Sequence, residues 1–174
     1  RRRLASVTSS AVTARKHTVR LPLLSATMMS TAMWAGHNLS APNCIDGLAG
    51  PPLATFCLSR LNDTSPWLSV QLAPAAAAVG VSHVLVHGRS DCCHNLLSPF
   101  EIWVAHAAGD PVANGGVACG PPVILPETAT SGPFTVACAG HSGTHVTLRL
   151  PGTQRTLNIE DIEVFGQRDR ESER

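Results

Sequence analysis

Short apolar segments separated by turn residues constrain the fold of this chain more than any other feature. Several of them alternate apolar and polar residues with a period of two, as half-buried strands do, and Gly, Pro, Asn and Ser fill the gaps. Examples are WLSVQL (67–72), VSHVLVH (81–87), FEIWVAH (100–106) and IEVFG (162–166). The one helix-like composition, APAAAAVG (73–80), is limited to about one turn by Pro74 and Gly80. The pattern predicts an all-β fold, an antiparallel β-sandwich.

Length and charge narrow the class of protein further. A chain of 174 residues has room for one domain of ordinary size. The formal net charge is +1, which favours no nucleic-acid partner, and no apolar run approaches the roughly 20 residues of a membrane span. The chain opens with Arg1, and LPLLSATMM (21–29) is too short and polar for a signal peptide, so we expect a segment of a longer protein.

Both ends of the chain differ in composition from the middle. Residues 1–20 carry Arg and Lys with no acidic residue, which predicts a basic N-terminal arm or linker. Residues 168–174 form a charged C-terminal tail. The predicted sandwich therefore spans residues 21–167.

The cysteines and glycosylation signals indicate an oxidising compartment. The chain has six Cys, an even number, and two Asn-x-Ser/Thr sequons at Asn38 and Asn62. Together they predict a secreted or cell-surface glycoprotein with disulfide bonds. The alternative is a cytosolic protein with free thiols.

The segment HGRSDCCHNLL (87–97) holds two adjacent cysteines, Cys92 and Cys93. Neighbouring Cα atoms lie about 3.8 Å apart, whereas ordinary disulfides prefer about 4.4–6.8 Å. The two cysteines therefore either bond to each other with strain or pair elsewhere, and the residues alone leave both possibilities open.

The order of motifs along the chain resembles one known family. The segments that carry the resemblance are SATMMSTAMWAG (25–36), NCIDGLAG (43–50), PWLSVQL (66–72), HGRSDCC (87–93), CGPP (119–122), FTVACAG (134–140), THVTLRLPG (144–152) and LNIEDIEVFG (157–166). From Leu21 to Gly166 the chain resembles the F-type lectins (the fucolectin and tachylectin-4 family). These belong to the galactose-binding-like group that includes the factor V/VIII C domains. The resemblance implies a jelly-roll-like sandwich.

The resemblance also implies a sugar site. In the family, α-L-fucose or a related sugar packs on a vicinal disulfide, which corresponds to Cys92–Cys93, while a His and two Arg side chains bond to its hydroxyls. Arg89 and Asp91 match the family motif, but His94 and Asn95 replace its Glu-Arg, and Ser59 or Arg60 stands where the contact His is expected. We expect sugar contacts from Arg89, Asp91, Cys92, Cys93, His94, Asn95 and Arg60. A second possibility is that Arg89 only braces the loop by pairing with Asp91.

Further features implied by the resemblance are disulfides and a calcium ion. The family bridges two late strands, which predicts Cys119–Cys138, and Glu160 replaces the usual partner of Cys57, which leaves Cys44 as its partner. Calcium takes six to eight oxygens, many from backbone carbonyls. Its candidate ligands are Asn43, Asp46, Thr55, Glu160 and Asp161. Alternatively, Asp46 caps a turn and Asp161 is a solvated acid.

The sequence gives little support for a zinc site or for catalysis. His83 and His87 share a strand pattern that places them about 13 Å apart, which argues against a zinc pair. Cys93 and His94 are adjacent on an extended chain and point apart, and no G-x-S-x-G or H-E-x-x-H motif is present, which argues against catalysis. The chain is therefore predicted to be a non-catalytic carbohydrate-binding module of a larger extracellular protein. The alternative is a structural or protein-interaction sandwich with a degenerate sugar site.

Overall fold

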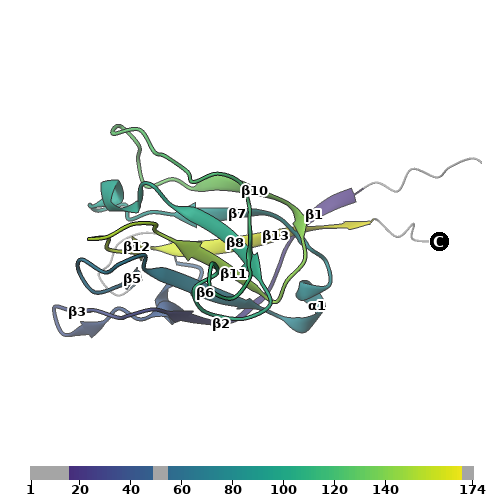
Figure 1. Ribbon diagram of the computed structural model, residues 1–174, viewed down its shortest axis with the longest axis horizontal. Coiled ribbons are helices and arrows are strands. Elements are labelled where there is room, and N and C mark those ends of the chain that lie inside the picture. Colours follow the sequence, from purple (N-terminus) through teal and green to yellow (C-terminus); the bar gives the residue numbers. More distant parts are fainter. Residues whose placement is uncertain (1–15, 49–54, 170–174) are drawn as a thin grey trace, which may run out of the picture.

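A computed structural model describes residues 16–48 and 55–169, except for the side chains of His94 and Asp169. Two antiparallel sheets pack against each other as a sandwich (Figure 1). The first sheet has the order β1 (Lys16–Arg20), β13 (Asp161–Asp169), β7 (Val81–His87) and β10 (Phe134–His141). The second has the order β2 (Leu23–Met28), β6 (Trp67–Leu72), β11 (His145–Arg149), β8 (Glu101–Ala105) and β9 (Val117–Ala118). The predicted all-β antiparallel β-sandwich is confirmed.

Short elements close the two ends of the sandwich. They are the hairpin β3 (Met33–Trp34) with β4 (His37–Asn38), the pair β5 (Cys57–Leu58) with β12 (Asn158–Ile159), the 3-10 turns η1 (Ala41–Cys44) and η2 (His94–Leu97), and α1 (Pro74–Ala77). In Figure 1, β3, β5 and β12 lie toward one end and α1 toward the other. The single turn predicted at residues 73–80 is thus confirmed. Within the described ranges, no helix has the length and apolar character needed to cross a membrane.

Two strands of the first sheet extend into the segments predicted to be the basic arm and the charged tail. The last five residues of the predicted basic arm form β1, which pairs with β13 from Lys16↔Asp169 to Arg20↔Phe165. KHTVR is largely exposed and has no apolar alternation, so its strand state comes from backbone pairing with an existing edge. Residues 168 and 169 of the predicted tail extend β13 accordingly. Residues 1–15 and 170–174 lie outside the described part of the chain.

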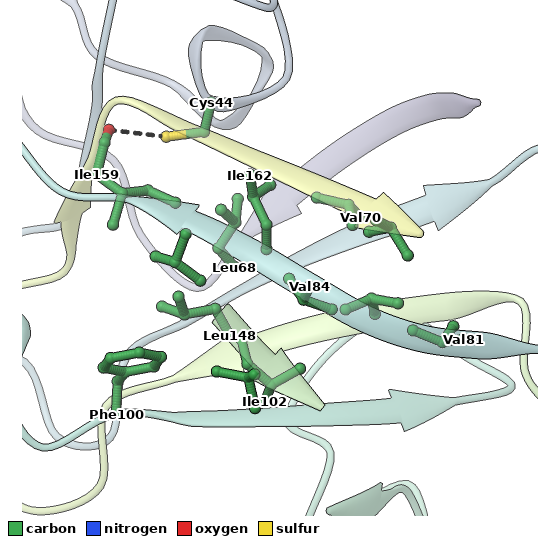
Figure 2. Packing of buried hydrophobic residues seen from close by; sticks show 14 of the residues in the cluster. Cys44, Leu68, Val70, Val81, Val84, Phe100, Ile102, Leu148, Ile159 and Ile162 are labelled. Atoms are coloured by element: carbon green, nitrogen blue, oxygen red, sulfur yellow. Dashed lines mark hydrogen bonds between the residues drawn. The ribbon is translucent and has the colours of Figure 1, made fainter. Parts of the chain in front are cut away.

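The core lies between the sheets because alternate residues of each strand point inward. Leu68 and Val70 of β6 are fully buried, as are Val84 of β7 and Ile162 of β13, and Figure 2 shows their side chains packed in one cluster. Fully burying a Val, Leu or Ile side chain stabilises a fold by about 1.5–3 kcal/mol. This layer holds the ends of β7 and β13 in a fixed register, from which the functional loop projects.

All three predicted disulfides are confirmed, and the described cysteines include no free thiol. Cys44–Cys57 ties η1 to β5, and the Cys44 sulfur lies 3.1 Å from the Ile159 carbonyl oxygen (Figure 2). Cys119–Cys138 links the segment after β9 to β10. Loops of this length give about 3 kcal/mol each on the chain-entropy account.

Candidate functional site

The candidate site is the loop of residues 88–97, which we call the cysteine loop. It leaves the end of β7 and enters the turn η2. Arg89 donates two hydrogen bonds to Asp91, from Nε to Oδ1 at 2.9 Å and from Nη2 to Oδ2 at 2.6 Å. This bidentate pair holds the pKa of the Asp91 carboxyl below its usual value, chiefly through the hydrogen bonds from Arg89. The guanidinium is thereby fixed in one orientation.

The guanidinium of Arg89 also packs on the face of an aromatic ring. The Arg89 Cζ atom lies 4.0 Å from the centroid of the Phe56 ring, a cation–π contact. Phe56 is buried and packs in a small cluster with Leu39 and Leu58, next to the Cys44–Cys57 disulfide. The side chain of Arg89 is 12% exposed, compared with 44% for Asp91. The guanidinium of Arg89 is therefore fixed by its contacts and largely shielded from solvent.

Cys92 and Cys93 form the vicinal disulfide, with Cα atoms 3.8 Å apart. Of the two possibilities left open by the residues, the structure has the bond between neighbours. Cys93 adopts the left-handed conformation, with φ 63°, and both cysteines are half-buried. Because both sulfurs are consumed in the bond, Cys93 offers no thiolate nucleophile. The ring instead presents a small, rigid, polarisable apolar surface beside Arg89.

A buried carboxylate anchors the cysteine loop to the sheet. Oε1 of Glu160 accepts hydrogen bonds from the backbone N of Ser90 at 2.7 Å and from its Oγ at 2.6 Å. The Glu160 backbone N donates to the His87 carbonyl at 2.8 Å, and the residue is 6% exposed. Glu160 thus connects the first residues of the loop to the start of β13.

The other residues predicted to contact the sugar lie in different environments. Asn95 is exposed and lines a hollow of about 210 Å³ with Ser98, Leu125, Pro126, Glu127 and Ala129. Arg60 is exposed, and in the described part of the chain its side chain makes no hydrogen bond or ion pair with the cysteine loop. Ser59 is buried, and its hydroxyl bonds to Arg60 O and Leu157 N, which gives it a structural role. The side chain of His94 lies outside the described residues.

Three of the five predicted calcium ligands make other hydrogen bonds in the structure. Glu160 is turned to Ser90, and Asn43 donates its amide to Phe56 O at 3.2 Å. Oδ1 of Asp46 accepts from Leu48 N at 2.9 Å, which is the turn cap expected as the alternative. The predicted ligand Thr55 is half-buried, and residues 49–54 of this loop lie outside the described chain.

Asp161 differs from these residues and is not the solvated acid of the alternative reading. It is 3% exposed, and its Oδ1 is buried without a hydrogen-bond partner. Burial raises the pKa of Asp161 to about 6. A buried carboxylate oxygen without a partner fits a bound cation.

Sequence reasoning missed Phe56, Ser90 and the orientation of Glu160. Phe56 reads as an ordinary core residue, and no local pattern links it to Arg89. Ser90 occupies the variable position of Arg-x-Asp, so the motif gave it no role. A larger hollow of about 550 Å³, lined by Lys16, Gly80, Ser82, Ala139 and Gln167 among others, lies at the opposite end of β7 and takes no part in this site.

Comparison with known proteins identifies solved structures that have a similar fold. No family model and no curated sequence matches the chain. A fucolectin from striped bass (Morone saxatilis) serum matches 82% of this chain at 25% identity with a TM-score of 0.62, and this chain spans 46% of that protein. The lectin domain of lectinolysin, complexed with Lewis B antigen, matches 80% of this chain and 90% of its own at 19% identity, with a TM-score of 0.61. A fucose-binding module of Streptococcus pneumoniae matches 82% of this chain and 90% of its own at 18% identity, with a TM-score of 0.63.

These matches, together with the two-sheet topology, define the class of protein as a galactose-binding-like β-sandwich. Within that class, the resemblance to the F-type lectins is confirmed: the chain has the fold of the fucolectins and fucose-binding modules. All three neighbours are named as lectins or sugar-binding modules.

Proposed function

We propose that the chain is a carbohydrate-binding domain that takes fucosylated glycans at the cysteine loop, as part of a larger extracellular protein. The observation that carries this proposal is the pairing of a fixed cation with a rigid apolar ring. Arg89, three residues before the vicinal disulfide, is held by Asp91 and Phe56. A sugar has hydroxyls on its edge and an apolar C–H face, and the two features match these two surfaces.

Pairing with Asp91 fixes the guanidinium of Arg89 in one orientation. A guanidinium carries five N–H groups, and the bidentate pair uses the Nε and Nη2 nitrogens. A prepositioned donor loses little rotamer entropy on binding, so a hydroxyl accepting from Arg89 would gain about 1.5–3 kcal/mol. The brace predicted as an alternative role and the sugar contact are therefore compatible.

The decisive experiment is titration of a panel of fucosylated, galactosylated and unrelated glycans against the wild type and three variants. Arg89→Ala should weaken binding by about tenfold or more, since about 1.4 kcal/mol corresponds to a factor of ten. Arg89→Lys keeps the charge but loses the fork and should lie between the two. Arg168→Ala, an exposed Arg on β13, is the matched control and should bind as the wild type does.

The alternative function is a structural or protein-interaction sandwich. If the wild type binds no glycan of the panel, the lectin proposal is rejected and this alternative stands. If binding occurs, Asn95→Arg tests specificity, because it restores the family motif next to the disulfide. It should raise fucose affinity relative to galactose.

Secretion and calcium form part of the same proposal. Three disulfides suit an oxidising compartment, and the sequon residues Asn38 and Asn62 are both exposed. Secretory expression should give a chain whose mass falls on peptide-N-glycosidase treatment. The oxygens of Asn43, Asp46 and Thr55 would hold calcium, which should raise the melting temperature by mass action. Asp46→Ala should remove that rise, and an unchanged wild-type melting curve after chelation would reject the calcium site.

A further inference from the structure

Three side chains of metal-binding types meet on the outer face of the first sheet, at the end of β7 that leads into the cysteine loop. They are His87 at the end of β7 and Asp161 and Glu163 at the start of β13. His87 lies directly across from Asp161 in the strand register, and Glu163 lies two residues further along the same face. One ligand atom from each residue lies within 4.8 Å of the others. We call this group the β7–β13 cluster.

The contacts inside the cluster leave its most buried oxygen without a partner. Nε2 of His87 and Oε1 of Glu163 are 2.9 Å apart, and Arg20 reaches Glu163 with Nε at 3.2 Å. The same Arg20 is 4.0 Å from Oδ2 of Asp161, which is too long for a hydrogen bond. Oδ1 of Asp161 has no hydrogen-bond partner although the side chain is 4% exposed. An unpaired buried carboxylate oxygen is costly, so the cluster lacks a cation close to Asp161.

We propose that His87, Asp161 and Glu163 bind a divalent transition-metal ion of the zinc class. One imidazole nitrogen and two carboxylate oxygens form a donor set typical of zinc, whereas calcium and magnesium take oxygen donors. Three protein ligands leave one tetrahedral position for water. His87 and Glu163 are 18% and 19% exposed, so the site opens to solvent on their side.

Arg20 acts as the counterion of the metal-free cluster. Its side chain is 55% exposed, so it can withdraw into solvent when a metal ion takes over the negative charge. This role distinguishes a metal site from a simple ion-pair network. In a network Arg20 is a partner, whereas in a metal site it competes with the ion.

The β7–β13 cluster does not use the His83–His87 pair, whose spacing along the strand argues against a shared metal ion. His83 does not face the cluster but stacks on Phe165, with ring centroids 4.7 Å apart. The carboxylates come from β13, far along the sequence, and no spacing motif announces them. The proposal does not depend on sugar binding, because metal binding is measured without a glycan.

The experiment uses the tag-free chain after chelator treatment, titrated with Zn²⁺ by calorimetry and with Co²⁺ by its visible absorption. The wild type should bind one zinc ion. His87→Gln should weaken that binding by about tenfold or more, since even outer partners of a ligand contribute 10- to 100-fold. His83→Gln, on the same face of β7, should match the wild type, and Arg20→Gln should bind more tightly. Equal affinities for His87→Gln and His83→Gln, or weaker binding by Arg20→Gln, would overturn the proposal.

Two further measurements guard against variants that fold poorly. In the wild type, zinc should protect His87 but not His83 from diethyl pyrocarbonate, read by peptide mass spectrometry; absence of that protection overturns the site. Asp46→Ala should abolish the calcium shift in melting temperature and leave zinc affinity unchanged. Loss of zinc binding in Asp46→Ala would instead assign the ion to the calcium loop and contradict the proposal.

Discussion

Asp91 and Asp161 each lie close to an arginine, and their environments give them opposite properties. On the cysteine loop, Asp91 is 44% exposed and accepts two hydrogen bonds from Arg89, which lower its pKa. In the β7–β13 cluster, Asp161 is 4% exposed and lies 4.0 Å from Arg20, and burial raises its pKa to about 6. The difference shows that the presence of an arginine nearby does not determine a carboxylate's charge. Contact geometry and access to water do.

The two regions are also connected. Glu160 accepts from Ser90 in the cysteine loop and immediately precedes Asp161 in the chain, while its backbone bonds to His87. A disturbance in the cluster can therefore reach the loop through a single residue. The predictions below test how different, and how independent, the two regions are.

The largest effect is expected from removing the buried charge. Because the folded pKa of Asp161, about 6, exceeds the ordinary 3.8, the folded state binds the extra proton between these values. Its contribution to the unfolding free energy is greatest below about pH 4 and falls as pH rises through 6. Asp161→Asn in chelator should therefore be more stable than the wild type at pH 7, by up to about 3 kcal/mol. Chemical denaturation between pH 4 and 8 measures this.

Asp91→Asn is expected to change stability in the opposite direction from Asp161→Asn. The folded pKa of Asp91 is depressed, so its contribution is present above the unfolded value of 3.8 and lost as pH falls through the folded value. Asp91→Asn should lower the unfolding free energy at neutral pH. Its unfolding free energy should also fall less steeply than that of the wild type as the pH is lowered into the acid range. Identical pH profiles for the two variants would contradict the comparison.

An intermediate effect is expected from changing Glu160, the residue that connects the two regions. Glu160→Ala leaves both Ser90 donors without their acceptor, which should reduce the unfolding free energy by about 1–3 kcal/mol and weaken glycan binding. Glu160→Gln retains Oε1 as an acceptor and should lose less of both. If Glu160→Ala binds glycans as the wild type does, the loop does not depend on this anchor.

The smallest effect is expected from Phe56→Leu. Leucine keeps apolar packing against Leu39 and Leu58 but removes the ring below Arg89, which should cost about 0.5–1 kcal/mol of binding free energy. Phe165→Leu, on the outer face beside His83, serves as the control and should leave glycan affinity unchanged. Glycan titration of both variants distinguishes a support of Arg89 from a general packing effect.

Much of the fold could be predicted from the sequence because its signals are local. The apolar runs at residues 67–72, 81–87 and 145–149 supply side chains to the core, and β6, β7 and β11 lie there. The disulfides also followed, once the resemblance supplied the pairing. β1 could not be found in this way, since an exposed edge strand has backbone partners but no apolar face.

The candidate site was only partly accessible. Arg89, Asp91 and the two cysteines form one short motif, so their proximity could be predicted from the chain itself. Phe56 could not, because its contact with Arg89 depends on how the segment from η1 to β5 packs beneath the loop. Glu160 was expected at a metal ion and instead bonds to Ser90, a choice that the neighbouring residues do not reveal.

By itself, therefore, the sequence determined where the main core strands lie and that Arg89, Asp91, Cys92 and Cys93 form one motif, since these features depend on residues a few positions apart. Only the tertiary structure decided which distant side chains share an environment. The register of β13 against β7 places Asp161 opposite His87, and burial beside that register raises the pKa of Asp161 while Asp91 remains paired and exposed. The physical reason is that strand register and desolvation are properties of the packed chain, and residues with the same side chain differ in charge according to both.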